Sequence, residues 1–449
     1  MIERYIVIGA GVSGICSSEL LINNGQSVTL YDGNDKLDRD RIIAEHPFMK
    51  DVSCIFGDIS EEQIKEFDKA VVSPGVPLDI DVIQLIRRNN IELWGEIELA
   101  YNYCKGKIIG ITGTNGKTTT TALTGDVIAS YYDDVRVVGN IGIPFTKMVS
   151  DSTDDTVFVI ELSSFQLETI KDFRPNVSAL LNITPDHLNR HHTMENYINA
   201  KKNIVVNQKS SDTCILNYED EVLREFGKTL DLNVVYFSSK RELEAGLYYK
   251  NSAIYYADNG KVDKIIDVDE LTILGTHNYE NAMCGIACGL SMGIPVESIV
   301  KALKSFKAVE HRIEYVCEKQ GVKFYNDSKA TNTDAAIKGI CAMNRPTYLI
   351  GGGYDKDAMY DEWVDCFSGR VKKLVLIGAT KDKIAVCCDE HGFKEYEFAS
   401  SLEEAMDICY KDADKGDAIL LSPACASWDM YDSYEVRGAD FKNHARSYE

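Results

Sequence analysis

The sequence lacks long hydrophobic runs and has no surplus of basic residues. No apolar stretch is long enough to span a bilayer, and residues 1–8 run straight into an expected strand, without a signal peptide. The chain carries 48 Lys and Arg against 70 Asp and Glu, a formal charge of −22. Binding to nucleic acid requires concentrated Lys and Arg. We therefore expect a cytoplasmic protein with no nucleic-acid partner and no transmembrane segment.

Cys-x-x-Cys motifs, short repeats and low-complexity linkers are absent as well. The 13 cysteines show no Cys-x-x-Cys spacing, and the only close groups are Cys387-Cys388 and Cys284 with Cys288. Reduced thiols are the plain interpretation. A composition of 45% hydrophobic and 26% charged residues is that of a globular protein, and 449 residues suggest about three domains. We expect a monomer.

The first segment has the pattern strand, glycine-rich turn, helix. Apolar residues 5–8 precede Gly9-Ala10-Gly11-Val12-Ser13-Gly14, and a second strand ends at Asp32. This layout predicts a Rossmann-like domain with a nucleotide phosphate or ribose at the helix N-terminus. It does not separate NAD from a uridine diphosphate sugar. Residues 73–77 follow another strand and form a loop at the expected ligand-binding edge.

The stretch 109–120 is typical of a phosphate-binding loop. Gly113 and Gly116 allow the backbone to fold around phosphate oxygens, Lys117 can reach the β- and γ-phosphates, and the hydroxyl of Thr118 or Thr119 can hold Mg²⁺. The spacing departs from the usual pattern, which has a glycine where this chain has Ile111. A glycine-rich turn without a ligand is the alternative interpretation.

Two further expected strands each lead to a candidate metal ligand near this loop. The strand over 156–160 ends in Glu161, a position expected for a Mg²⁺ ligand. The strand over 177–182 leads to His187, which is placed to meet a second metal ion. We expect His191 and His192 to be loop residues.

The remaining patterns complete an α/β fold of three domains. Residues 243–266 predict short antiparallel strands joined by Asn-Gly-type turns. Strands at 321–325, 347–350, 373–377 and 418–421 alternate with helices, which is a doubly wound pattern. We expect a Rossmann-like domain over 1–95, a P-loop ATPase-type parallel sheet over 96–308, and a second Rossmann-like domain over 309–449.

Taken together, several segments resemble the Mur ligases, the ATP-dependent amino-acid ligases of peptidoglycan precursor synthesis. The resemblance covers essentially the whole chain and is greatest to members that add D-glutamate to UDP-N-acetylmuramoyl-L-alanine. Its distinctive segments are Gly113-Thr114-Asn115-Gly116-Lys117-Thr118, Glu161-Leu162-Ser163-Ser164-Phe165-Gln166-Leu167-Glu168, Asn182 to His187, His277-Asn278-Tyr279-Glu280-Asn281-Ala282, His311-Arg312 and Asn326-Asp327-Ser328-Lys329-Ala330-Thr331-Asn332.

The resemblance implies roles for the matched positions. Lys117, Glu161, His187 and Lys201 would be catalytic, and Thr118, Glu161, His187 and Lys201 would lie near two Mg²⁺ ions. Lys201 falls where the family carries a carbamylated lysine. The ATP-binding positions would be Gly113, Thr114, Asn115, Gly116, Lys117, Thr118, Thr119, Asn278, Asn281, Arg312, Asp327 and Lys329.

The same resemblance implies where the other substrates bind. The first domain would hold UDP rather than NAD, through Val12, Ser13, Asp32, Gly33, Asn34 and Gly75, with Asn140 at the muramoyl end. Ser163 and Gln166 also fall among the substrate-binding positions. D-glutamate would be bound by Thr331, Lys356, Ser427 and Trp428, and by Tyr434, which stands where an apolar aromatic residue is expected. Some relatives have a basic residue after the acidic one, which Gly33-Asn34 lacks.

The implied reaction activates a carboxylate by transfer of the γ-phosphoryl group of ATP, after which the amine of D-glutamate attacks the acyl phosphate. Alternatives are a sister ligase adding L-alanine or a diamino acid, and a folylpolyglutamate-type enzyme. A nicotinamide-dependent oxidoreductase would use the first motif and leave the phosphate loop without a role. A non-catalytic nucleotide-binding regulator would leave many polar positions without a role.

Overall fold

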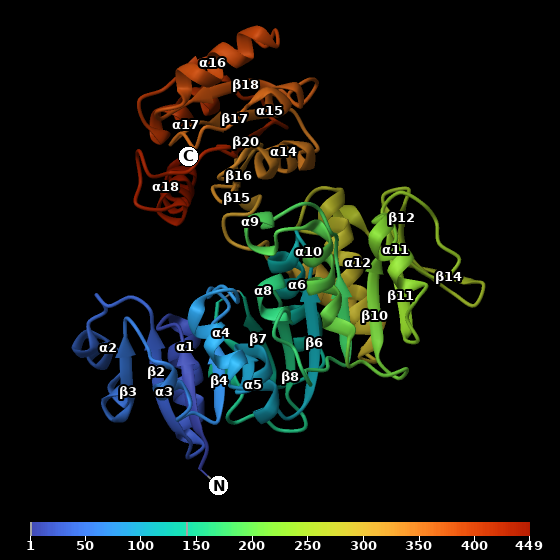
Figure 1. Ribbon diagram of the computed structural model, residues 1–449. Coiled ribbons are helices and arrows are strands. Elements are labelled where there is room, and N and C mark those ends of the chain that lie inside the picture. The colour runs from blue at the N-terminus through green and yellow to red at the C-terminus, as the bar shows by residue number, and fades with distance from the viewer. Residues whose placement is uncertain (1, 141) are drawn as a thin grey trace. The chain divides into compact units, whose positions relative to one another are not determined.

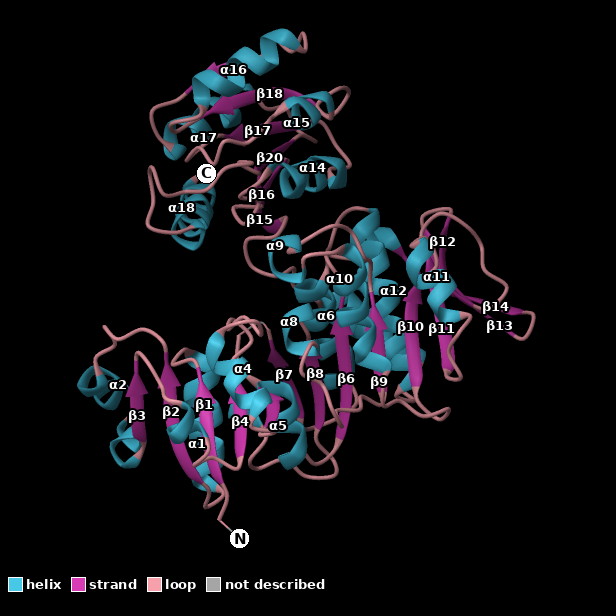
Figure 2. Ribbon diagram, in the orientation of Figure 1, coloured by secondary structure: helices cyan, strands magenta, loops and turns pink. Residues whose placement is uncertain are grey.

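The computed structural model describes residues 2–140 and 142–449, which form two compact units (Figure 1). Unit 1 comprises Met1–Ile266 and Glu280–Ala302, and unit 2 comprises Asp267–Tyr279 and Leu303–Glu449. The described chain contains three sheets, most of whose neighbouring strands are parallel, so the fold is α/β. Figure 2 shows helices packed around these sheets. The division of the chain into three domains stays a prediction.

The first sheet of unit 1 is entirely parallel, with strand order β3-β2-β1-β4-β5. Its strands are Arg4–Ile8 (β1), Ser27–Asp32 (β2), Ser53–Phe56 (β3), Lys69–Val72 (β4) and Glu92–Gly95 (β5). The helices of this part are Val12–Asn23 (α1), Arg39–Glu45 (α2), Glu61–Ile64 (α3), Asp81–Arg88 (α4) and Glu96–Tyr103 (α5). The last four residues of β1 are buried, as expected for an apolar strand covered on both faces.

The second sheet of unit 1 has the order β14-β13-β12-β11-β10-β9-β6-β8-β7. Its strands are Lys107–Thr112 (β6), Val135–Gly139 (β7), Val157–Glu161 (β8), Val177–Leu180 (β9), Thr213–Asn217 (β10), Asn233–Ser238 (β11), Gly246–Lys250 (β12), Ala253–Asp258 (β13) and Lys261–Asp267 (β14). The accompanying helices are Lys117–Ala129 (α6), Phe145–Met148 (α7), Ser164–Leu167 (α8), Leu188–His191 (α9), Met194–Lys202 (α10), Glu221–Gly227 (α11), Thr276–Ser291 (α12) and Val296–Ser305 (α13). The strands from β7 to β12 pair in parallel.

The predicted antiparallel strands of residues 243–266 are confirmed. Strands β12 and β13 pair antiparallel, and the turn between them places Asn251 and Ser252 at positive φ. The next turn, between β13 and β14, places Asn259 and Gly260 at positive φ. Positive φ at both central residues gives a tight turn whose twist matches that of the strands, which explains the asparagine and glycine there.

The sheet of unit 2 has the order β15-β16-β20-β17-β18-β19. Its strands are Glu314–Lys319 (β15), Val322–Asn326 (β16), Thr347–Gly351 (β17), Val371–Leu376 (β18), Tyr396–Phe398 (β19) and Ala418–Leu421 (β20). Its helices are Thr333–Ala342 (α14), Asp361–Asp365 (α15), Lys381–Glu390 (α16), Leu402–Asp412 (α17) and Tyr434–Ser447 (α18). Only the pairing of β15 with β16 is antiparallel among the pairs of this sheet in the described chain. The four predicted strands therefore exist, and their ends differ from the predicted ones by two residues at most.

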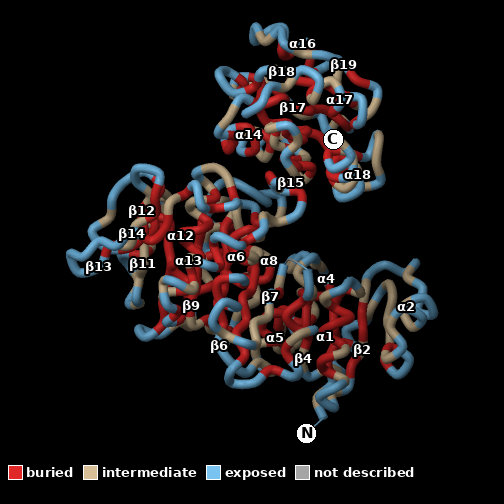
Figure 3. The backbone as a smooth tube through the Cα atoms, turned by 180° about the vertical axis from the view of Figure 1, so that it is seen from behind, coloured by how far each residue is buried: buried red, intermediate tan, exposed pale blue. Residues whose placement is uncertain are grey.

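Burial follows the sheets. Figure 3 shows the buried residues running along the strands and the helix faces that cover them. Every one of the 13 cysteines is a free thiol, as the sequence indicated. Within the described residues, no helix combines the length and apolar character needed to cross a membrane.

Candidate active site

The segment Gly113–Thr118, called the loop below, follows β6 and ends in the first turn of α6. Strand β6 pairs in parallel with β8 and β9. Gly113 and Gly116 have φ values of +154° and +85°. A methyl group on Gly113 would come within 2.9 Å of the Leu181 Cβ, and one on Gly116 within 2.6 Å of the Asn281 Oδ1. Close approach and backbone conformation therefore both require glycine at these two positions.

Side chains from the neighbouring strand end hold this loop in place. The Asn182 Oδ1 accepts a hydrogen bond from the Asn115 N at 2.8 Å, and the Asn182 Nδ2 donates to the Asn115 O at 3.0 Å. The Thr114 hydroxyl contacts the Thr184 O at 3.1 Å and the Tyr197 hydroxyl at 2.9 Å. The sequence interpretation missed Asn182 and Tyr197 as supports of the loop. Asn182 could have been found, since it directly follows a strand at this edge.

Two lysines converge on carbonyl oxygens of the loop. The Lys117 Nζ donates to the Gly113 O at 3.0 Å and to the Thr114 O at 2.9 Å, and the Lys201 Nζ donates to the Gly113 O at 2.7 Å. Lys201 is only 1% exposed, and burial together with the charge of Lys117 lowers its pKa to about 7. A large share of this buried amine is therefore neutral near pH 7.

Glu161, at the end of β8, is buried with one oxygen unsatisfied. Its Oε1 accepts a hydrogen bond from the Asn140 Nδ2 at 2.9 Å, and its Oε2 is buried without a hydrogen-bond partner among the described residues. Leaving a buried carboxylate oxygen unpaired costs free energy, which a bound cation would recover. The residues present thus fit a Mg²⁺ ion at this position.

The histidines after β9 differ in their environments. His187 is exposed, has a φ of +52°, and its ring centroid lies 4.9 Å from that of Phe165. His191 is 3% exposed, and its Nε2 lies 2.9 Å from the Ser164 Oγ, while burial lowers its pKa to about 4. The expectation that His191 is a loop residue is wrong, because His191 is the last residue of α9, and its ring packs against Phe165 and Tyr197.

Ser163 and Gln166 close the N-terminus of α8. The Ser163 Oγ accepts from the Gln166 N at 3.2 Å, and the Gln166 Oε1 accepts from the Ser163 N at 2.9 Å. This reciprocal capping box explains both residue types locally. Their role in binding substrate stays a prediction.

The predicted uridine diphosphate residues surround the turn after β1. A methyl group on Gly14 would overlap the Gly9 carbonyl oxygen, so only glycine allows α1 to approach β1 this closely. The Asp32 Oδ2 accepts from the Ala10 N at 2.8 Å, and its Oδ1 accepts from the Asn34 N at 3.0 Å. Val12 is 69% exposed at the start of α1. Of the other predicted members, Ser13 lies in the first turn of α1, and Gly33 and Gly75 lie in the loops that follow β2 and β4.

Unit 2 gathers predicted residues at the ends of β16 and β20. Asp327 is buried, its Oδ1 accepts from the Ile313 N at 3.2 Å, and its Oδ2 accepts from the Ser422 Oγ at 2.7 Å. Burial raises the pKa of this carboxyl to about 7. The Lys329 Nζ lies 5.3 Å from the Tyr434 ring centroid.

A second group in unit 2 lies around residues 427 and 428. The Lys356 Nζ lies 4.8 Å from the ring centroid of Trp428, which is 63% exposed. The Ser427 Oγ is buried without a hydrogen-bond partner in the part of the chain that the structure describes. An unpaired buried hydroxyl beside an exposed indole and a lysine is suited to a polar ligand.

Arg437 ties these two groups together, and the sequence interpretation missed it. The guanidinium is 1% exposed and donates to the Ser328 Oγ and O at 3.0 and 2.9 Å, and to the carbonyls of Cys425 and Ala426. Burial lowers its pKa to about 10. No local signal in the sequence separates this arginine from a surface residue of a helix.

The structure therefore brings the predicted residues together in separate sets. In unit 1, Lys117, Lys201, Glu161 and Asn140 lie at the carboxyl ends of β6, β7 and β8 or against the loop that follows β6. Asn281 belongs to this unit, and its Oδ1 accepts from the Thr120 hydroxyl at 3.0 Å. Asn278 belongs to unit 2, where its Nδ2 donates to the Leu274 O at 2.7 Å. Arg312 and Thr331 also belong to unit 2.

The fold and these clusters define an α/β protein whose polar groups gather at the carboxyl ends of parallel strands. Three family models match the chain. The model for the N-terminal domain of MurD-like Mur ligases matches residues 3–95, that for the Mur ligase middle domain matches 111–289, and that for the Mur ligase glutamate ligase domain matches 311–425. The chain belongs to the Mur ligase family.

Curated relatives align over nearly the full length. The UDP-N-acetylmuramoylalanine--D-glutamate ligase of Lachnoclostridium phytofermentans is 50% identical over 99% of this chain and 98% of its own. The protein of the same name from Lachnospira eligens is 51% identical over 98% of each chain.

Solved structures share the fold at low identity. UDP-N-acetylmuramate-alanine ligase from Thermotoga maritima superposes with a TM-score of 0.60 at 19% identity over 100% of both chains. MurF ligase from the same organism, solved in complex with ADP, gives a TM-score of 0.59 at 16% identity over 99% of this chain and 96% of its own.

Proposed function

We propose that this chain adds D-glutamate to UDP-N-acetylmuramoyl-L-alanine with consumption of ATP, in cytoplasmic peptidoglycan precursor synthesis. One observation carries the proposal: two proteins named for this ligation are 50% and 51% identical to the chain over at least 98% of it. Family membership removes the oxidoreductase alternative, because the glycine-rich turn lies within the match to MurD-like N-terminal domains.

The proposal assigns each predicted domain a role. Residues 1–95 are a Rossmann-like domain for the uridine diphosphate group, supported by the parallel order β3-β2-β1-β4-β5 and by the tight turn at Gly9 and Gly14. Residues 96–308 are the P-loop ATPase-type domain, and residues 309–449 are a Rossmann-like domain that binds the amino acid. The protein acts as a monomer, which light scattering would check.

The loop Gly113–Thr118 and Thr119 bind the ATP phosphates. Gly113 and Gly116 keep the backbone clear of side chains, so amide groups can meet phosphate oxygens. The Lys117 Nζ donates to two loop carbonyls in this structure. When ATP binds, the Lys117 side chain turns to the β- and γ-phosphates of the nucleotide. The proposal also assigns Asn278 and Asn281 to the adenine and ribose, and Arg312, Asp327 and Lys329 to the binding of ATP.

Four residues hold two magnesium ions: Thr118, Glu161, His187 and Lys201. The unsatisfied, buried Glu161 Oε2 supports this assignment. Bound Mg²⁺ would offset the negative charge where phosphate and carboxylate meet. Lys201 contributes as a carbamate, because its lowered pKa leaves a neutral amine that can add to carbon dioxide with loss of a proton.

The chemistry forms an amide through two transfers. The carboxylate of the L-alanine residue takes the γ-phosphoryl group of ATP, and Lys117 stabilises the charge that develops. The amine of D-glutamate then attacks the carbonyl carbon, forming a tetrahedral intermediate, and phosphate leaves. The nucleotide sugar is positioned by Val12, Ser13, Asp32, Gly33, Asn34, Gly75, Asn140, Ser163 and Gln166.

In unit 2, Thr331, Lys356, Ser427, Trp428 and Tyr434 bind D-glutamate. The Lys356 ammonium can pair with a carboxylate of the amino acid while it lies against the Trp428 ring. The unpaired Ser427 hydroxyl supplies a donor for the same ligand. Arg437 positions Ser328 and the carbonyls of 425 and 426, so that the two groups of this unit keep a fixed geometry.

Phosphate release tests the proposal. Purified protein receives ATP, Mg²⁺ and UDP-N-acetylmuramoyl-L-alanine, together with D-glutamate, L-glutamate, L-alanine, L-lysine or diaminopimelate. Release that depends strictly on D-glutamate is expected. Phosphate release with another amino acid would assign the chain to a sister ligase. If no amino acid led to phosphate release, the ligase proposal would be overturned.

A further inference from the structure

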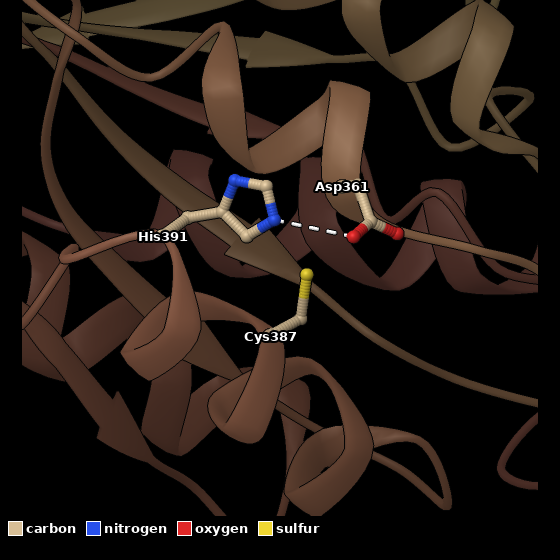
Figure 4. Close-up of side chains that lie close together, drawn as sticks. All are labelled: Asp361, Cys387 and His391. Atoms are coloured by element: carbon tan, nitrogen blue, oxygen red, sulfur yellow. Dashed lines mark hydrogen bonds and ion pairs between the residues drawn. The ribbon is translucent and has the colours of Figure 1, made fainter.

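Helices α15 and α16 of unit 2 carry ligand-type side chains that the ligase proposal does not use. Figure 4 shows the Asp361 carboxylate, the Cys387 sulfur and the His391 imidazole pointing toward a common centre. One ligand atom from each lies within 4.8 Å of the other two. The His391 Nε2 and the Asp361 Oδ1 are 3.2 Å apart.

Helix geometry explains how these residues meet. Cys387 lies in the last turn of α16 and His391 is the residue that follows this helix, where the His391 N donates to the Cys387 O at 3.0 Å. Asp361 and Asp365 are likewise four residues apart on α15, so they lie on one face of that helix. Cys387 is buried at the junction of the two helices, while the Asp361 side chain is 48% exposed. An ion could reach the cluster from solvent.

The second carboxylate fixes the orientation of the imidazole. The His391 Nδ1 lies 2.6 Å from the Asp365 Oδ1. The Nε2 in turn lies 3.2 Å from the Asp361 Oδ1, and hydrogen bonds to Asp365 and Asp361 raise the pKa of His391, so a metal ion would have to displace the proton on Nε2. That nitrogen faces Asp361 and Cys387 (Figure 4).

The cluster contains no basic side chain other than the histidine. Among the described residues, His391 is the only ion-pair partner of Asp361 and Asp365. His391 also follows the C-terminus of α16, where the helix dipole favours positive charge.

Another acidic cluster with a histidine provides a contrast. Glu310, His311 and Glu314 also lie close together. There, however, Lys442 pairs with both glutamates, at 3.2 Å from the Glu314 Oε1. The chain itself supplies a lysine to that cluster, whereas His391 is the only ion-pair partner of Asp361 among the described residues.

We propose that Asp361, Cys387 and His391 form a binding site for a divalent metal ion of the zinc class, with Asp365 as the residue that orients His391. Sulfur, nitrogen and oxygen donors together suit Zn²⁺ or Co²⁺ far better than Mg²⁺. On binding, the Cys387 thiol and the His391 Nε2 each lose a proton to solvent as the sulfur–metal and nitrogen–metal bonds form. Three protein ligands leave a fourth position for water, and the ion links α15 to α16.

Cobalt titration of the full-length protein, after treatment with a chelator, tests this site. Co²⁺ is expected to produce a thiolate charge-transfer absorption that saturates at one equivalent and disappears when Zn²⁺ is added. Cys387→Ser should abolish this absorption, and His391→Ala should weaken Co²⁺ binding at least tenfold. Asp365→Asn should weaken it by roughly 10- to 100-fold, as expected for a residue that orients a ligand.

Two matched variants serve as controls. Cys341→Ser removes an exposed thiol of the same unit, and His444→Ala removes a partly exposed histidine whose Nε2 lies 3.1 Å from the Asp407 Oδ1. Both should keep the absorption and the affinity of the unmodified chain. Circular dichroism confirms that each variant is folded. The proposal is overturned if the unmodified chain shows no thiolate absorption at one equivalent of Co²⁺, or if folded Cys387→Ser retains it.

Discussion

The buried Nζ of Lys201 donates a 2.7 Å hydrogen bond to the carbonyl oxygen of Gly113, across 88 residues of sequence. This hydrogen bond fixes the amine of Lys201, on α10, against the loop proposed to bind ATP. Because burial and the charge of Lys117 lower the pKa of Lys201 to about 7, a neutral amine is available near neutral pH. Carbamylation becomes chemically accessible where an ordinary lysine would remain protonated.

Lys201→Ala should therefore be inactive in phosphate release. A short carboxylic acid that fills the place of the carbamate should restore part of the activity, because it returns a negative oxygen ligand to the site. Lys202→Ala removes the adjacent lysine, whose Nζ lies 4.6 Å from the Phe226 ring centroid, and should remain active. Activity in Lys201→Ala without added acid would remove this residue from the proposed mechanism.

Glu161→Gln should fold but lose turnover. The amide oxygen can still accept from Asn140, while the charge that would hold Mg²⁺ is gone. We expect a loss of roughly 10²–10³-fold in the rate of phosphate release at saturating Mg²⁺. Asp155→Asn, at an exposed position shortly before the same strand, is the control and should behave like the unmodified chain. Equal rates for both variants would exclude Glu161 as a metal ligand.

Alanine at Gly14 and Gly11 should have different effects. The Gly14→Ala methyl group would overlap the Gly9 carbonyl oxygen, so the free energy of unfolding should fall by about 2 kcal/mol or more. Gly11 has a φ of −77° and open space around its Cβ position, so the free energy of unfolding of Gly11→Ala should stay within about 0.5 kcal/mol of that of the unmodified chain.

Calorimetric titration with UDP-N-acetylmuramoyl-L-alanine completes this comparison. If the turn binds the diphosphate, the stable Gly11→Ala variant should bind more weakly, since its methyl group stands where the backbone approaches the phosphates. Unchanged affinity in Gly11→Ala would argue against a diphosphate at this turn.

We expect the buried carboxyl group of Asp327 to make the free energy of unfolding depend on pH. Burial raises its pKa from 3.8 to about 7, so between these values the folded chain keeps a proton that the unfolded chain has lost. The free energy of unfolding should therefore fall as pH rises through this window, by roughly 1.4 kcal/mol per pH unit from this one group. Asp327→Asn should remove that part of the slope, measured by urea unfolding from about pH 4 to pH 8. Parallel pH profiles for the two proteins would contradict the assignment.

Much of the fold could be predicted because local patterns agreed with the final packing. The apolar runs that form β1, β6 and β8 are buried on both faces, as parallel strands are, and each ends in a polar or glycine-rich segment. Such segments gather at one edge of a parallel sheet, so the sequence alone is sufficient to place Gly113 and Glu161 at the same edge.

The remaining features depend on contacts between distant residues. Nothing near Tyr197 in the sequence indicates that its hydroxyl meets Thr114, and nothing near Arg437 indicates a buried guanidinium bound to carbonyls. The burial of His191 has the same origin, since its ring packs against Phe165 and Tyr197 on other elements. Residues 267–279 belong to unit 2 although they precede a segment of unit 1. No local sequence pattern indicates this return of the chain to unit 1.

The hydrogen bonds by which Asn182 and Thr184 hold the loop after β6 have a consequence for binding kinetics and affinity. The backbone of the loop loses its conformational freedom when the protein folds, so the nucleotide proposed to bind there does not have to order it. Its association can then proceed without waiting for a rare loop conformation, and the affinity reflects the contacts made rather than the entropy of an initially mobile segment.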